Sequence, residues 1–297
     1  MISNTIAAKD TILKCIAEHG WNPENNYYYY QNREVRGMKN VFLKFNDMGI
    51  LTQVHNDKTW HLFANGILAP SEKRIGILTE FISHALKKYK RVKLELTDEL
   101  RKELIMKLKN SPYKVMAANY ILYWPVFNMK KWDDKLEGGD WKKLRNLRNK
   151  LHKEHRVEVK PSTEFSKEEL KNIVEEWRKS RPSKERSEFE QYLKWIDSGF
   201  MGCDCARSVV IDGEPCTITA GWKIPNSNNY YSAIGLCNYK YEGLNEVANA
   251  DDLIFLKSQG YDYVDFGGGE KPLTAFKMKF KPESVYETAV FSIVNKA

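Results

Sequence analysis

The sequence predicts an α/β (α+β) protein built from two tandem lobes, each a mixed, partly antiparallel sheet flanked by helices. Two observations lead to this expectation. The chain has 297 residues, which is enough for two domains of ordinary size. Each half also runs in the same order, with strands first and then a helix, a strand, a helix and a strand, and this order favours a mixed sheet over a parallel one.

In the first half, residues 5–19 have the pattern of a helix, and three strands are expected at 41–45, 49–55 and 59–65. Turn-forming Asn-Asp pairs separate these strands, so they form a meander. Ser71 is expected to cap a helix at 74–89. A strand at 92–96, a helix at 98–109 and a long aromatic strand at 113–126 complete the half.

The second half begins with a basic connecting helix at 140–155, for which Asp140 is the expected N-cap. Helices are then expected at 167–179 after Ser166, at 188–197, at 244–258 and at 273–280. Strands are expected at 157–160, 208–211, 217–224, 230–236, 261–266 and 285–294. The predicted lobes are therefore residues 1–135 and 136–297.

The charge balance indicates a local anionic partner. The chain has 47 basic and 39 acidic residues, a net charge of +8. Residues 141–156 alone hold seven basic side chains and one acid, Glu154. Such a local excess predicts contact with an anion better than the overall charge does.

Other composition features exclude several classes of protein. The five cysteines have no zinc-binding spacing and the six histidines form no metal pattern, so we expect reduced thiols and no metal requirement. The start of the chain does not look like a signal peptide, and no apolar stretch approaches the ~20 residues of a membrane helix. We therefore expect a cytoplasmic protein without a transmembrane segment.

The connecting helix carries the first candidate motif. Arg145 and Arg148 lie three residues apart, so they project from the same side of the helix. Two guanidinium groups placed in this way can hold a phosphate or a carboxylate. The other interpretation is a solvated basic face, which composition alone favours.

The second candidate motif is the segment 261–270, in which a strand ending in Asp265 and Phe266 leads into Gly267, Gly268 and Gly269. Glycines permit tight turns and close approach of a ligand to the backbone. Asp265 and Glu270 then lie at the carboxyl end of a strand, where open α/β sheets place ligands. A plain turn explains the glycines about equally well.

Two weaker motifs complete the set. Segment 276–282 is an amphipathic helix end with Lys277 and Lys279 among its cations, and an ordinary surface helix is the favoured interpretation. Segment 231–243 is a strand followed by Asn238, Tyr239 and Gly243 at a helix start, where free N–H groups can bind anions. An ordinary strand-to-helix turn is again favoured when this segment is taken alone.

Taken together and in this order, the motifs over residues 130–282 resemble the C-terminal catalytic domain of lysyl-phosphatidylglycerol synthases. They are also similar to the Fem-type peptidyltransferases. Both families have two acetyltransferase-like (GNAT-like) lobes. The resemblance implies acyl transfer by direct attack of a neutral amine on an activated carbonyl, with alignment of the two substrates as the main contribution.

The resemblance also implies roles for particular residues. The base would be Asp265, Glu270 or a water, and Tyr231 or Tyr239 would protonate the leaving group. A backbone N–H of the strand 231–236 would stabilise the oxyanion, and the backbone of Ser232, Phe266, Gly267 and Gly268 would line the cleft. The donor's phosphates would lie near Arg145, Arg148, Asn238, Gly243, Lys277 and Lys279.

The helix start at 238–243 departs from the coenzyme A-binding pattern, because only Gly243 remains of its glycines. An aminoacyl-tRNA donor is therefore slightly favoured over acyl-CoA, with an amine of a small molecule, peptide or lipid as acceptor and no tightly bound cofactor. The alternatives are an acyl-CoA-dependent N-acyltransferase and a non-catalytic RNA-binding protein. The sequence leaves the oligomeric state open.

Overall fold

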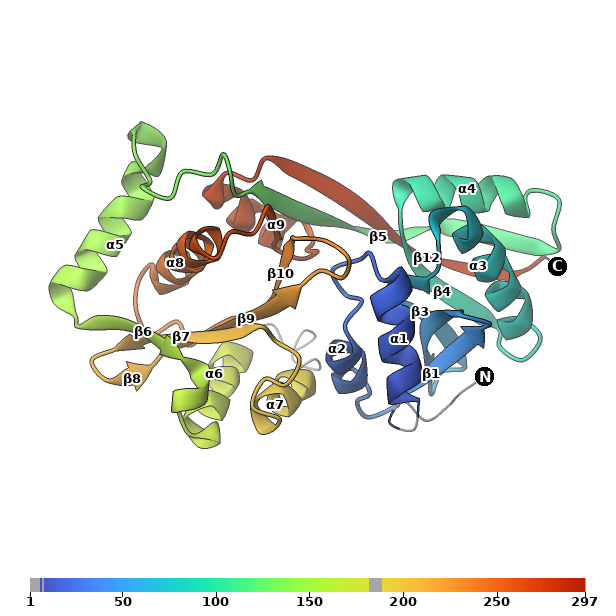
Figure 1. The fold of residues 1–297 in the computed structure, drawn as a ribbon, viewed down its shortest axis with the longest axis horizontal. Coiled ribbons are helices and arrows are strands. Elements are labelled where there is room, and N and C mark those ends of the chain that lie inside the picture. Colours follow the sequence, from blue (N-terminus) through green and yellow to red (C-terminus); the bar gives the residue numbers. More distant parts are fainter. Residues whose placement is uncertain (1–5, 7, 182–188, 297) are drawn as a thin grey trace.

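The computed structural model describes residues 6, 8–181 and 189–296. The chain forms two lobes joined side by side through one continuous sheet (Figure 1). The N-terminal half contains, in order, α1 (Lys9–His19), α2 (Tyr27–Asn32), β1 (Met38–Phe45), β2 (Met48–His55), β3 (Thr59–Leu68), α3 (Ser71–Ala85), β4 (Arg91–Thr97), α4 (Asp98–Leu108) and β5 (Tyr113–Asn128).

The C-terminal half begins with the short helix η1 (Gly139–Trp141), α5 (Lys142–Glu154), β6 (Val157–Pro161), η2 (Ser162–Glu164), α6 (Lys167–Lys179) and α7 (Glu190–Asp197). It continues with β7 (Cys205–Ile211), β8 (Glu214–Pro215), β9 (Thr217–Lys223), β10 (Tyr230–Cys237) and α8 (Leu244–Ser258). It ends with β11 (Tyr263–Asp265), α9 (Lys271–Lys277), η4 (Met278–Phe280) and β12 (Ser284–Asn295).

Each half contributes its last strand to the other half. The sheet order is β1-β2-β3-β4-β12-β5-β11-β10-β9-β7-β6, so β12 lies against β4 while β5 lies against β11. The two exchanged strands also pair with each other from Ser284↔Val126 to Asn295↔Tyr113. Among the strands of the described residues, β3–β4 and β10–β11 are the parallel pairs and the others are antiparallel, so the mixed, partly antiparallel sheet is confirmed.

Helices cover both faces of this sheet. The apolar side chains of α3 and α4 pack on one face of the N-terminal half, and those of α8 and η4 pack on the same face of the C-terminal half. The opposite face is covered by α1 and α2 in one half and by α6 and α7 in the other, and α2 contacts α7 at the junction between the lobes (Figure 1). We call this second face the α2/α7 face.

The predicted helix starts are partly corrected. Ser166 does cap α6, in a capping box with Glu169. Ser71 is instead the first residue of α3, after Pro70, and makes no capping bond. Asp140 lies inside η1, so α5 starts from Trp141 without a side-chain cap. The helix α2 was not predicted, because its sequence YYYYQN shows no helical apolar period.

Candidate active site

The strands β10 and β11 separate from each other shortly after they meet. They pair only at Tyr230↔Val264 and Tyr231↔Asp265. Beyond Tyr231, β10 carries a bulge against β9 between Ser232 and Ile234. A bulge disrupts the ladder and re-aims the backbone. The split therefore leaves backbone groups of β10 beside a gap, next to Asp265.

The glycine loop after β11 wraps around two aromatic rings of the split. Gly267 has φ +76°, and a Cβ there would lie 3.2 Å from the Tyr231 ring. A Cβ on Gly268 would lie 2.7 Å from the Trp124 indole, closer than real side chains approach. Gly269 bridges to Tyr123 of β5. The glycines are thus required by close packing against the site.

Asp265 is held firmly at the end of β11, where it is 4% exposed. Its two oxygens accept hydrogen bonds from the Gly267 N–H (2.7 Å) and the Tyr286 hydroxyl (2.8 Å). Burial raises the pKa of Asp265 to about 6, opposed by these bonds and by the charge of Lys277. Through these two hydrogen bonds Asp265 orients the glycine loop and the Tyr286 side chain.

Lys277 points inward from α9. Its ammonium group donates to the carbonyl oxygens of Phe266 (2.6 Å) and Gly267 (2.8 Å). Burial lowers the pKa of Lys277 to about 8, and the carboxylate of Asp265 opposes this shift. Lys277 therefore places a half-buried cation at the end of β11, beside the split.

A second buried carboxylate, Glu24, reaches the split from the connection between α1 and α2. Its Oε1 accepts hydrogen bonds from the hydroxyls of Tyr29 (2.9 Å) and Tyr231 (3.2 Å). Burial and the negative charge of Glu95 raise the pKa of Glu24 to about 8, against the hydrogen bonds of the two tyrosines and the charge of Arg33. Glu24 can thus hold or release a proton near neutral pH.

Glu95 of β4 extends this polar group into the N-terminal half. Its Oε1 accepts a bond from the Thr288 hydroxyl (2.8 Å), which in turn accepts one from the Trp124 indole N–H (2.9 Å). The Trp124 ring stacks on Tyr286, with 5.5 Å between centroids. Burial is the main cause of the raised pKa of Glu95. One connected set of side chains therefore links the two lobes on the α2/α7 face.

The N-terminus of α8 lies beside the connecting helix. Gly243 precedes α8 with φ +75°, and a Cβ there would lie 2.9 Å from Leu147 of α5. Asn238 is buried and builds the preceding turn by accepting the Lys240 N–H (3.1 Å), while Tyr239 is 47% exposed. Glu246 in the first turn of α8 pairs with Lys279 (2.8 Å). This acid already compensates the positive end of the helix, which disfavours a pyrophosphate there.

The two arginines of α5 both have partners within the chain. Arg145 donates to the carbonyl oxygens of Leu136 and Gly138, and Arg148 pairs with Asp251 of α8 (3.2 Å). The structure therefore uses both guanidinium groups to anchor α5, and does not bring them together as a clamp. The apolar side of α5 is packed against the fold, since Leu144 and Leu151 are buried.

The exposed cations of α5 line an open groove of about 480 Å³ beside the turn before α8. Its side chains include Lys142, Lys143, Asn146, Lys150 and Glu242. Lys150 pairs with Glu242 (2.7 Å), whereas no partner is found for Lys142 or Lys143 among the residues that the structure describes. This groove is a basic surface next to the start of α8.

Glu270 lies outside the buried centre. Its side chain is exposed at the start of α9, where its backbone carbonyl accepts the Thr274 N–H. The centre itself contains six of the predicted residues, and it brings their side chains or backbone groups together with Glu24: Tyr231, Asp265, Phe266, Gly267, Gly268 and Lys277. Glu24 and Glu95 were not predicted, because no local sequence signal distinguishes a buried glutamate from an exposed one.

The N-terminal lobe has a corresponding split that the chain itself fills. β3 and β4 pair only from Thr59↔Arg91 to His61↔Lys93. The Trp21 indole N–H donates to the Ile67 carbonyl of β3 (3.0 Å), and Arg74 stacks on the Trp21 ring at 3.9 Å. Side chains of the chain itself therefore occupy this N-terminal split.

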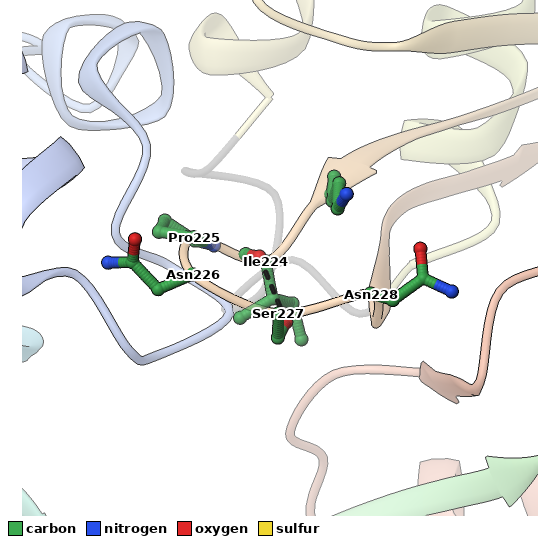
Figure 2. Close-up of a pocket in the computed structure, with 6 residues that line it drawn as sticks. Ile224, Pro225, Asn226, Ser227 and Asn228 are labelled. Carbon is green, nitrogen blue, oxygen red and sulfur yellow. Dashed lines mark hydrogen bonds between the residues drawn. The ribbon is translucent and has the colours of Figure 1, made fainter.

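A second hollow, of about 440 Å³, lies at the turn between β9 and β10. Figure 2 shows the side chains of Asn226 and Asn228 pointing to opposite sides of this turn. Asn226 donates to the Gly20 carbonyl (2.8 Å) and Asn228 to the Gly260 carbonyl (2.9 Å). These polar groups tie the turn to its neighbours and do not converge on a ligand.

The part of the chain that the structure describes contains neither a group of metal ligands nor a helix suited to cross a membrane. Within residues 6, 8–181 and 189–296, no three His, Cys, Asp or Glu side chains are grouped as metal ligands would be. In the same residues no helix combines the length and the apolar character needed to cross a bilayer.

Comparison with known proteins identifies the family. Residues 35–288 match the family described as phosphatidylglycerol lysyltransferase, C-terminal, and the chain belongs to it. The fold is that of tandem GNAT proteins, and the protein is an enzyme of the acyl and aminoacyl transferase group, which sets the non-catalytic alternative aside. A search of curated proteins finds no match.

Similar solved structures include L-PGS from Bacillus licheniformis, with 14% identity and a TM-score of 0.68, covering 97% of this chain and 91% of that one. FemX has 12% identity and a TM-score of 0.63, covering 97% and 96%. A tandem GNAT protein from the clavulanic acid biosynthesis pathway has 11% identity and a TM-score of 0.58, covering 99% and 97%. At these identities the likeness supports the fold.

Proposed function

We propose that the protein transfers an aminoacyl group from aminoacyl-tRNA to an amine acceptor. The observation that carries this proposal is the basic groove of α5, which adjoins the turn before α8, the helix that follows β10. A carrier held on Lys142 and Lys143 has its phosphates on a cationic surface, where such contacts dominate the affinity of nucleic acids.

In this proposal the activated carbonyl enters the split and lies beside the bulge at Ser232. Backbone N–H groups of β10 stabilise the oxyanion, and Asp265 keeps the glycine loop and Tyr286 in place. The Tyr231 hydroxyl, which lies beside the split, donates a proton to the leaving oxygen in this proposal. The protein supplies alignment and charge, and it forms no covalent intermediate.

Acyl-CoA is the second candidate donor. Its pyrophosphate would need the turn before α8, where Tyr239 has φ +57° and Glu246 occupies the first turn of the helix. A pyrophosphate requires free backbone N–H groups at a helix start, and the side chains of Tyr239 and Glu246 take the place of such an open site here. This contrast favours the tRNA carrier.

The test is a transfer assay with tRNA charged with a mixture of radiolabelled amino acids, with propylamine and lysine-containing peptides as acceptors. We expect enzyme-dependent appearance of labelled amide, and less of it when Lys142 and Lys143 are both replaced by glutamate. Equal transfer from acetyl-CoA, with none from charged tRNA, would contradict the proposal.

A further inference from the structure

We propose that Glu24 is the catalytic base of this site, and that the acceptor reaches it as an ammonium ion on the α2/α7 face of the sheet. This inference rests on the proposed function, because it assigns the proton transfer that an amine acceptor requires. Glu24 lies in the N-terminal lobe, whereas the candidate motifs of the sequence all lie in the C-terminal lobe.

The carboxylate of Glu24 has one occupied oxygen and one oxygen available to a substrate. Oε1 accepts both tyrosine hydroxyls, from Tyr29 and Tyr231. Oε2 has no hydrogen-bond partner in residues 6, 8–181 and 189–296, although Glu24 is only 8% exposed. Oε2 is not among the fully buried unpaired atoms of these residues, so it keeps some exposure, and a hydrogen-bond donor that arrives with a ligand can reach it.

The backbone around Glu24 is fixed by the rest of the chain. The Glu24 N–H donates to the Asn22 side chain (3.0 Å), and the Trp222 indole N–H donates to the Pro23 carbonyl (2.8 Å). Trp222 belongs to β9, so the C-terminal sheet holds this N-terminal connection in place. Glu24 is therefore positioned rigidly, as a proton acceptor in catalysis must be.

Glu24 lies at the point where the split begins. Tyr231 is the last residue of β10 that pairs with β11, and its hydroxyl contacts Glu24 at 3.2 Å. A donor carbonyl in the split is thus close to the Tyr231 side chain. An amine bound to Oε2 of Glu24 would approach this carbonyl from the N-terminal lobe, opposite the carrier.

The surroundings of Glu24 suit a cation. Tyr29, Trp222 and Tyr231 form a wall in which neighbouring ring centroids are 5.2–5.3 Å apart. Aromatic faces attract ammonium groups, more strongly where water is excluded. A second carboxylate, Glu95, adds negative charge near Glu24. Its side chain is half-buried, so the end of the cluster formed by Glu95 remains accessible.

The charged and titratable groups that face Glu24 are Glu95 from β4, Tyr29 from α2, Arg33 directly after α2, Tyr231 from β10 and Tyr286 from β12. Burial and Glu95 raise the pKa of Glu24 to about 8, and the hydrogen bonds of Tyr29 and Tyr231 and the charge of Arg33 lower it. A base of this strength is matched to removing a proton from an ammonium ion near neutral pH.

The reaction is balanced without any further reactant. Ionised Glu24 takes one proton from the ammonium group, and the amine nitrogen then forms a bond to the acyl carbon. The bond from the acyl carbon to the ester oxygen of the carrier breaks, and the second proton of the nitrogen passes to that oxygen. Glu24 finally releases its proton to water, so the products are an amide, the free carrier hydroxyl and one proton.

The first experiment tests the ammonium site with propylamine, which needs no donor. Calorimetric titrations at pH 7 in two buffers of different ionisation enthalpy give the affinity and the number of protons released. Since the pKa of Glu24 is about 8, it is about nine-tenths protonated at pH 7, and binding of propylammonium should release about 0.9 proton.

Propanol is the neutral probe, and Glu24→Gln and Glu99→Gln, at an exposed position of α4, are the matched variants. We expect Glu24→Gln to bind propylamine at least tenfold more weakly and without proton release, and Glu99→Gln to behave as the wild type. Failure of the wild type to bind propylamine, binding without proton release, or equal affinity of Glu24→Gln would overturn the proposal.

The second experiment measures transfer from charged tRNA against pH. Glu24→Gln should lower the rate at least ~100-fold while the affinity for charged tRNA changes less than about twofold. In the wild type the rate should rise with pH through a limb near pH 8, and Glu95→Gln should move that limb to lower pH. Unchanged transfer by Glu24→Gln would refute its role as base. If propylamine binds as expected but no charged tRNA supports transfer, the proposed donor is wrong and the assignment of Glu24 stands.

Discussion

Replacement of Glu24 by glutamine should stabilise the protein, and more so at higher pH. The folded pKa of Glu24 is raised to about 8 from an ordinary 4.5, so the folded state binds its proton more tightly than the unfolded state does. The free energy of unfolding therefore falls as pH rises between these two values. At about 1.4 kcal/mol per pH unit, this one group lowers stability by about 4 kcal/mol between pH 5 and pH 9.

Glutamine cannot ionise, and its carbonyl oxygen can still accept the hydroxyls of Tyr29 and Tyr231. Urea unfolding at pH 5, 7 and 9 should thus show a stability gain for Glu24→Gln that grows by about 4 kcal/mol over this range. Glu270→Gln, at an exposed position, should follow the wild type within about 0.5 kcal/mol. Parallel curves for the wild type and Glu24→Gln would refute the argument from burial.

Three further outcomes are expected. The double change Lys142→Glu and Lys143→Glu should weaken binding of charged tRNA and reduce the slope of log affinity against log salt by about two. The control change Lys107→Glu with Lys109→Glu, at the end of α4, should leave the slope unchanged. Equal slopes for the two variants in filter binding would contradict the role of the groove in tRNA binding. Gly268→Ala should lower the free energy of unfolding by about 1–3 kcal/mol and reduce transfer, because its Cβ would lie 2.7 Å from Trp124. Gly76→Ala in α3, where nothing lies within 4 Å of the added Cβ, should not lower stability in urea unfolding and should leave transfer unchanged. Excess EDTA should leave transfer unchanged, and a loss restored by added zinc would show a metal requirement that we do not expect.

Local signals in the sequence predicted most of the elements. α6 and α8 begin and end where the sequence predicts, because a capping box at Ser166 starts one and Gly260 follows the other. The helix α2 escaped prediction because packing stabilises it. Its Tyr27 and Tyr30 are buried against α1 and the N-terminal sheet, and Asn26 caps it.

The exchange of β5 and β12 between the halves could not be predicted. Both strands were expected from their own sequences, but periodicity specifies which face is buried and does not specify the neighbouring strand. The pairing of β12 with β4 and β5 depends on contacts between segments far apart in the chain.

The candidate site was predictable only where its chemistry is local. Asp265 and the glycine loop form one short motif, and the structure brings this motif to the split. Glu24 and Glu95 gain their high proton affinity from burial between elements distant in sequence, so no local pattern identifies them. Arg145 and Arg148 show the reverse case, since their spacing suggests a clamp but each has a partner in the fold.

The central claim is that the donor is an aminoacyl-tRNA held beside α5 and α8. The most direct test is the melting temperature of the purified protein with charged tRNA, uncharged tRNA and acetyl-CoA. A ligand at about 100 times its dissociation constant should add about 2.7 kcal/mol to the free energy of unfolding. We predict an upward shift with charged tRNA that exceeds the shift with uncharged tRNA, and no shift with acetyl-CoA. A shift with acetyl-CoA alone would contradict the account and would identify the protein as an acyl-CoA-dependent N-acyltransferase.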